Sequence, residues 1–84
     1  MINNFYSSTM REEINDLMKK YEVCTNYYTI YSDEFIDTLI DYFNDRKIEA
    51  NIVIEEYGKM MDRCCFTSWI ENNHLQTMHF YIVN

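Results

Sequence analysis

The feature that most limits the fold of this chain is the alternation of apolar and polar side chains in its C-terminal half. Residues 48–57 (IEANIVIEEY) follow the period of two that is typical of a half-buried β-strand. Two further segments rich in strand-forming side chains follow at residues 60–70 and 75–83. The three segments are separated by two-residue turn signals, Gly58-Lys59 and Asn72-Asn73. We therefore predict a three-stranded antiparallel meander.

The two turns fix the strand register independently of each other. A Gly58-Lys59 turn pairs Tyr57 with Met60 and so places Ile52 opposite Cys65, and an Asn72-Asn73 turn places Cys65 opposite Phe80. Both registers gather the same side chains on one apolar face: Ile48, Ala50, Ile52, Ile54, Met61, Cys65, Trp69, Met78, Phe80 and Ile82. A slip of one residue in either hairpin would destroy this agreement.

The reverse face of the predicted sheet is only partly polar. It carries Val53, Tyr57, Cys64, Phe66, Ile70, His79 and Tyr81. A monomer rarely exposes a contiguous apolar patch of this kind. Two explanations stay open: the two helices cover one sheet face each, or the reverse face meets a second copy or a partner.

Two segments of the N-terminal half show helical periodicity. Residues 32–47 place an apolar stripe at helical spacing behind an N-cap at Ser32. Residues 9–21 do the same behind a capping box formed by Thr9 and Glu12. Between them, residues 23–31 (VCTNYYTIY) favour a strand. The expected fold is a single α+β domain over residues 1–84, with two helices packed on a three- or four-stranded antiparallel sheet in the order α-β-α-β-β-β.

The outer side of the predicted helix at 32–47 is a ridge of carboxylates. Its acidic residues are Asp33, Glu34, Asp37, Asp41 and Asp45, and Tyr42 flanks them. A four-residue repeat at about 1.5 Å per residue gives one carboxylate roughly every 6 Å. Like charges at this spacing oppose helix formation by about 0.2–0.5 kcal/mol per pair. The ridge is either a solvated face or a binding surface for a basic partner, and we take all six residues as candidate partner-binding residues.

The charge balance limits the classes of partner. The chain has 14 acidic against 7 basic residues, for a net charge of −7. Direct nucleic-acid binding is disfavoured, because phosphate contacts require Lys and Arg, and a helix-turn-helix motif would present aspartates to the major groove. Three cysteines, two of them adjacent, do not make a disulfide framework, so we expect a reducing, cytosolic setting. The first ten residues lack the features of a signal peptide, and no apolar run reaches the length of a membrane span.

Catalytic and metal-binding signals are weak. A Cys64–His79 pair would lie on an open sheet without oxyanion donors, and phosphate-binding loops need more glycine than the single Gly58. No C-x-x-C pair is present, which leaves only weak zinc candidates: Cys24, Cys64, Cys65 and His79. Zinc at such a site would be structural. We expect a protein that is not an enzyme and needs no cofactor.

In size, charge, Asn/Ile/Tyr-rich composition and the Asp33–Asp45 ridge, the chain resembles the small acidic proteins that phages make against bacterial defences, above all anti-CRISPR proteins. The resemblance implies a non-enzymatic inhibitor that acts in the cytoplasm of a phage-infected cell. It also implies a basic nucleic-acid-binding partner, namely a CRISPR effector nuclease. The alternative from a different class is a homodimeric structural or regulatory interaction protein that uses the reverse sheet face, with zinc as an optional stabiliser.

Overall fold

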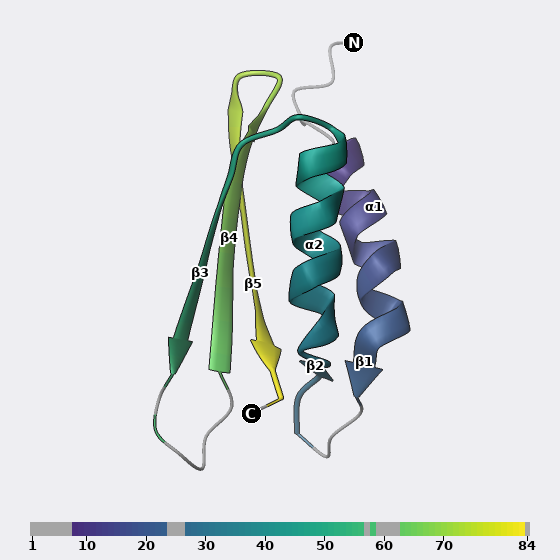
Figure 1. Cartoon of the computed structure of the whole chain (residues 1–84), viewed down its shortest axis with the longest axis vertical. Helices are drawn as coiled ribbons and strands as arrows, with labels where there is room; N and C mark the ends of the chain where they lie inside the picture. The colour runs from purple at the N-terminus through teal and green to yellow at the C-terminus, as the bar shows by residue number, and fades with distance from the viewer. Residues whose placement is uncertain (1–7, 24–26, 57, 59–62, 84) are drawn as a thin grey trace, which may run out of the picture.

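The structure is a computed structural model that describes residues 8–23, 27–56, 58 and 63–83. Its helices are α1 (Thr9–Met18), continued by a 3-10 turn η1 (Lys19–Tyr21), and α2 (Glu34–Asp45). Its strands are β1 (Glu22–Val23), β2 (Ile30–Tyr31), β3 (Ala50–Glu56), β4 (Arg63–Glu71) and β5 (His74–Ile82). The strands form one sheet in the order β1-β2-β5-β4-β3, and both helices pack on the same face of it (Figure 1). The predicted α+β class is confirmed.

The C-terminal hairpin has the predicted register. Glu71 lies opposite His74, and Cys65 lies opposite Phe80. Asn72 and Asn73 have φ angles of 51° and 67°. Positive φ at both central residues is the requirement of the type I′ turn, whose twist matches that of the two strands. Asparagine tolerates this left-handed conformation, so the Asn-Asn pair determines the hairpin locally.

The other hairpin differs from the prediction by two residues. Ile52 lies opposite Thr67 instead of Cys65, and Ile54 takes the place opposite Cys65. Within the described residues the pairs run from Ala50–Trp69 to Glu56–Arg63, and this register does not fit the predicted two-residue Gly58-Lys59 turn. The predicted Tyr57–Met60 pair and Met61 lie outside the described residues. Because side chains alternate with a period of two, a shift of two residues leaves the apolar face intact.

The single strand predicted over residues 23–31 is wrong. The structure has two short strands there, β1 and β2, which pair antiparallel with each other. Strand β2 also pairs with β5 in parallel, with Ile30 opposite Tyr81. The sheet is therefore five-stranded and mixed, not three- or four-stranded and antiparallel. Strand propensity favours extended backbone, but it does not decide how much of a segment pairs, or with which neighbour.

Both predicted helix starts are displaced by one residue. Helix α1 is capped by Ser8 and not by Thr9: the Ser8 Oγ accepts a hydrogen bond from the Arg11 backbone N–H at 3.0 Å. The N-cap of α2 is Asp33 and not Ser32. The helical spans themselves agree with the prediction, because they follow from the apolar stripes and not from the caps.

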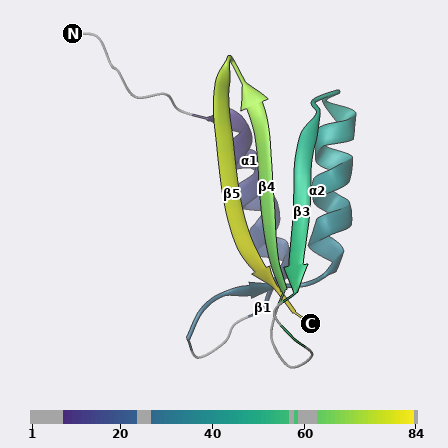
Figure 2. The same ribbon diagram turned by 90° about the vertical axis from the view of Figure 1, so that its left-hand side faces the viewer.

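Of the two explanations left open for the reverse face, the one in which each helix covers one sheet face is wrong, as the view onto the open side of the sheet shows (Figure 2). The core lies between the sheet and the two helices and is formed by Met10, Ile14, Met18, Phe35, Leu39, Tyr42, Phe43, Cys65, Trp69, Phe80 and Ile82. Both helices direct their buried side chains into this one core, so they lie side by side over the same face of the sheet (Figure 2).

Phe35 lies at the centre of this core. Its side chain is fully buried. Its ring centroid lies 5.2 Å from that of Phe80, 5.6 Å from that of Tyr21 and 6.1 Å from that of Tyr31. Phe35 thereby joins α2 to strand β5, to strand β2 and to the end of the first helical segment.

We predict that Phe35→Ala lowers the free energy of unfolding by about 3–5 kcal/mol, through lost burial and the cavity it leaves. Ile70→Ala is the control, because Ile70 lies on the open sheet face and is 56% exposed. Its loss should stay below about 1 kcal/mol. Urea unfolding of the three proteins checks the comparison, and equal losses would contradict this placement of the core.

Candidate partner-binding interface

The carboxylates of α2 do not form one straight row. A step of four residues turns the position on a helix by about 40°, so Asp33 and Asp45 differ by about 120°. Asp33 turns toward the sheet, where its carboxylate accepts a hydrogen bond from Arg63 on β4 at 2.7 Å. Asp41 and Asp45 turn toward α1. Glu34 and Asp37 are exposed. The predicted ridge is therefore divided, and its C-terminal half faces the neighbouring helix.

A groove of about 470 Å³ runs between α1 and α2. Its lining comes from both helices and consists of Glu13, Asp16, Leu17, Thr38, Asp41, Tyr42, Asp45 and Arg46. The lining thus includes four carboxylates and one guanidinium, that of Arg46. Two of the acidic residues, Glu13 and Asp16, belong to a helix whose exposed face is balanced in sign along the sequence. Only the packing of the helices brings them together with Asp41 and Asp45.

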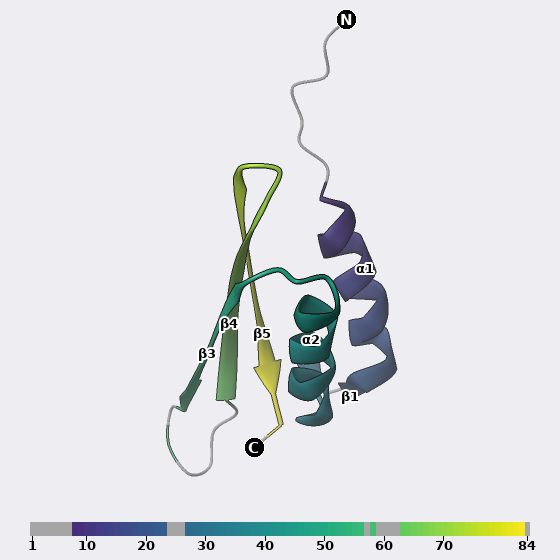
Figure 3. The same ribbon diagram turned by 45° about the horizontal axis from the view of Figure 1, so that its top comes forward.

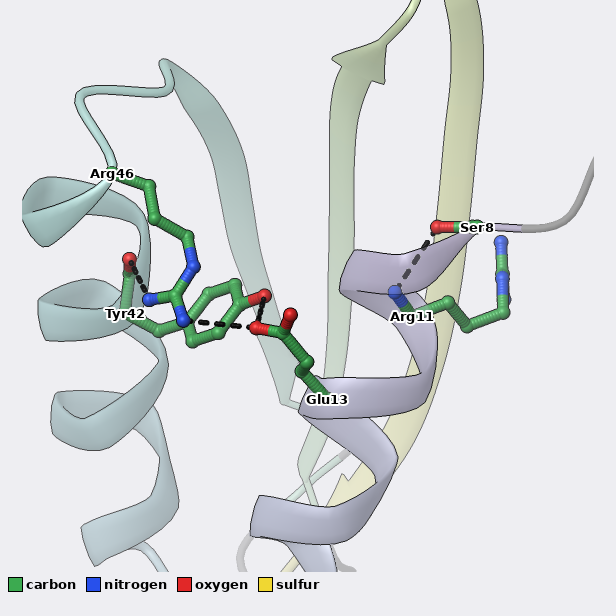
Figure 4. Close-up of polar contacts among 5 residues, drawn as sticks. All are labelled: Ser8, Arg11, Glu13, Tyr42 and Arg46. Carbon is green, nitrogen blue, oxygen red and sulfur yellow. Dashed lines mark hydrogen bonds and ion pairs between the residues drawn. The ribbon is translucent and has the colours of Figure 1, made fainter.

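Tyr42 does not flank the ridge at the surface as predicted. It is 5% exposed and forms the floor of the groove. Its hydroxyl donates a hydrogen bond to Glu13 Oε2 at 2.7 Å, across the two helices (Figure 4). Burial raises the pKa of Tyr42 above its ordinary value, and the hydrogen bond to Glu13 raises it further. The residue therefore acts as a neutral donor that holds a groove carboxylate in place.

Arg46 belongs to the same network. Its guanidinium lies 3.6 Å from the centroid of the Tyr42 ring and donates to Glu13 Oε2 at 2.9 Å. It also donates to the Tyr42 backbone carbonyl at 3.3 Å, one turn earlier in the same helix. Glu13 thus receives two donors, one from Tyr42 and one from Arg46. Asp41 and Asp45 form no ion pair within the described residues, so the negative charge of the groove is concentrated on the α2 side.

Arg11 turns away from the groove. Its guanidinium donates to Gln76 Oε1 at 3.1 Å and to the Thr77 carbonyl at 2.7 Å, both on β5. It also lies 5.8 Å from the centroid of the Trp69 ring. Arg11, one of the three basic residues of the segment 9–21, therefore serves the contact between helix and sheet, while Lys19 forms an exposed ion pair with the groove residue Asp16 at 3.7 Å. The acidic residues are left on the outer side of the helical layer.

The predicted zinc candidates divide between the core and the open sheet face. Cys65 is buried beneath the helices, and its Sγ lies 3.7 Å from Thr67 Oγ1. Cys64 is buried as well, and burial raises the pKa of both thiols. His79 stacks on Phe66 with ring centroids 5.9 Å apart. Cys24 lies outside the described residues. Within the part of the chain that the structure describes, no three His, Cys, Asp or Glu side chains are grouped to hold a metal ion.

Comparison with known proteins gives no match: no protein family, no curated protein and no solved structure corresponds to this chain. Among the described residues, no helix has the length and apolar character needed to cross a membrane. The functional interpretation therefore depends on the groove and its chemistry.

We predict that Tyr42→Phe lowers stability at pH 7 by about 0.5–1.5 kcal/mol, because the hydrogen bond to Glu13 is lost. This difference should shrink above pH 10. The folded pKa of Tyr42 is raised, so its contribution is fully present below the unfolded pKa of about 10 and is lost as pH rises above it. At pH 11 the parent should therefore have lost most of its advantage over the variant, which has no hydroxyl to titrate at this position. Urea unfolding at both pH values checks this, and a difference independent of pH would contradict it.

Proposed function

We propose that this protein is a non-enzymatic binding protein that inhibits a nucleic-acid-processing enzyme through the acidic groove between α1 and α2. The observation that carries the proposal is the gathering of Glu13, Asp16, Asp41 and Asp45 around one hollow that contains a single guanidinium. The groove suits a lysine- or arginine-rich segment, since opposite charges steer association and select partners. Such segments line the nucleic-acid sites of effector nucleases.

The aspartates of α2 reduce the stability of the helix, and this loss of stability supports a role in binding. Asp37, Asp41 and Asp45 repel one another at four-residue spacing, and Asp45 lies at the C-terminal end of α2, where the helix dipole disfavours an anion. Solubility alone does not require negative charge at these positions. A cationic partner would relieve the repulsion, so part of the cost would be recovered on binding.

The proposed class of protein is an anti-CRISPR inhibitor that works in the cytoplasm of a phage-infected cell. The net charge of −7 on 84 residues and the acidic helical layer support this reading. Carboxylates on both sides of a groove would occupy the basic site that a nucleic-acid backbone otherwise fills. Glu34 and Asp37 would extend the contact along α2.

The test uses purified CRISPR effector complexes loaded with guide RNA. It measures whether this protein binds them and whether it blocks cleavage of a matched DNA target. We predict that Asp41→Lys together with Asp45→Lys weakens effector binding at least about tenfold, because it places like charges against the basic site. The double variant should be at least as stable as the parent, since it removes repulsion and suits the helix dipole. Affinity of the parent should fall as salt rises and screens the charges.

Glu22→Lys together with Glu56→Lys is the matched control. It changes the net charge by the same amount at two exposed strand positions away from the groove. The control should keep most of the parent's inhibition. If the groove variant inhibits as well as the control, the groove is not the binding site. If the parent binds no effector of any type, the anti-CRISPR role is excluded.

A further inference from the structure

The outer edge of β3 has the features of a strand that can accept another strand. Strand β3 lies at the end of the sheet order, so among the described residues no strand pairs with its far side. It matches β4 one residue to one over seven residues, without a bulge. It also lacks proline and lysine, which commonly protect an edge strand from further pairing. The main-chain groups along this edge are therefore in position to bind an extended segment.

Helix α2 extends past this edge, so the layer between helix and sheet continues beyond the last strand (Figure 2; Figure 3 gives a tilted view). The space there is a groove of about 420 Å³, lined by Ile40, Phe43, Asn44, Ile48, Glu49, Ala50, Asn51 and Ile52. Ligand sites usually have volumes of about 300–1,000 Å³. Ile40 on α2 is 40% exposed and Ile54 on β3 is 39% exposed. The groove therefore offers apolar surface to alternate side chains of one more strand.

The charge along this edge has one sign. Residues 48–56 contain three glutamates and no lysine or arginine. Glu49 and Glu55 alternate with the helix-facing side chains of β3, so they lie on the open side of the sheet. A strand added here meets carboxylates on the open side and apolar side chains on the helix side. Opposite charges across a strand pair stabilise it, and like charges destabilise it.

The occupant of this site is not β3 of a second copy. Antiparallel pairing of two β3 edges would bring the two α2 helices, which extend past the edge on the same side of the sheet, into the same space (Figures 2 and 3). It would also bring two acidic strands together. The site therefore suits a segment with no helix of its own at that position and with positive charge.

We propose that the β3 edge binds an extended segment of a partner protein, which adds as a sixth strand beside β3. Its apolar side chains enter the groove under α2, and its lysine or arginine side chains lie opposite Glu49 and Glu55. Main-chain hydrogen bonds supply affinity in this mode of recognition, and the alternate side chains supply specificity. The site is separate from the groove between α1 and α2, so it does not depend on the inhibitory function proposed above.

A blocked heptapeptide, Lys-Val-Thr-Val-Thr-Val-Lys, is a probe with this pattern. Beside β3 it places its two lysines opposite Glu49 and Glu55 and its three valines on the helix side. Its sequence is the same from both ends, so it fits parallel and antiparallel addition alike. We expect the labelled probe to bind the full chain with a Kd on the order of 100 µM or below, measured by fluorescence anisotropy. No binding up to about 1 mM overturns the proposal.

Methylation of the peptide backbone distinguishes strand addition from attraction between charges alone. Alternate N–H groups of a strand point to its opposite edges. Methyl groups on the five central backbone nitrogens therefore block whichever edge meets β3, while the side chains and the charge stay the same. We expect this control peptide to bind at least about tenfold more weakly, because strand pairing supplies the affinity. Unchanged affinity overturns the proposal.

A substitution in the groove tests the helix side of the site. Ile40→Ala removes apolar surface that the valines would cover and should weaken probe binding about two- to tenfold. Ile70→Ala is the matched control, because Ile70 is 56% exposed on the reverse sheet face. It should leave the affinity nearly unchanged. Equal weakening by both substitutions overturns the proposal in favour of the reverse face.

Matched pairs of substitutions separate the edge from the acidic groove. Glu49→Gln with Glu55→Gln should weaken probe binding about two- to thirtyfold, because two cross-strand pairs with lysine are lost. Asp41→Asn with Asp45→Asn removes the same charge from the groove between α1 and α2 and should have little effect. Equal or stronger weakening by the second pair places the peptide in that groove and overturns the proposal.

Sedimentation equilibrium of the parent chain alone tests the remaining occupant. We expect the mass of one 10.3 kDa chain at micromolar concentrations, because the edge is left for a partner. A dimer that dissociates as the probe binds overturns the proposal in favour of a second copy.

Discussion

Burial of one apolar sheet face by two helices is the interaction on which the rest of this structure depends. Trp69 and Phe80 on the sheet meet Phe43 and Phe35 on α2, with ring centroids 5.4 and 5.2 Å apart. Helix α1 adds Met10, Ile14 and Met18 to the same core, so α1 and α2 lie side by side over that face. Once both helices occupy one face, their polar sides form one outer layer. The acidic groove is a consequence of that packing.

The same arrangement explains why two surfaces of the sheet stay open. With both helices on one side, the reverse face exposes Val53, Phe66, Ile70 and Tyr81. Strand β3 ends the sheet order, so within the described part of the chain its outer edge has no partner strand either. A domain of this size has too few residues to cover both faces and both edges. Its interaction surfaces are therefore of two kinds, a charged helical layer and an apolar sheet.

Local signals account for the parts of the fold that sequence reasoning predicted well. Asn72-Asn73 supplies two positive φ angles, so the β4–β5 register follows from the turn itself. The β3–β4 register was wrong by two residues, because a glycine between two strand patterns indicates a hairpin but does not fix which residues of the two strands pair. The strand predicted at 23–31 became β1 and β2 for a related reason. Strand β2 pairs with β5, which is about fifty residues later in the sequence, and such long-range pairing cannot be predicted from the local residue pattern.

The candidate site was predicted only in half. Asp41 and Asp45 could be placed on one helix from their spacing, but Glu13 and Asp16 could not be assigned to the same groove, and Tyr42 was expected at the surface. Helical periodicity gives the angle of a residue around its own axis; it does not give the neighbour that the residue faces. The sequence by itself determined the helices, the apolar face and the acidic excess, because these depend on residue type and period. Only the tertiary structure decided that both helices share one face, since an apolar stripe makes a helix pack against a sheet but does not determine which face of the sheet it covers.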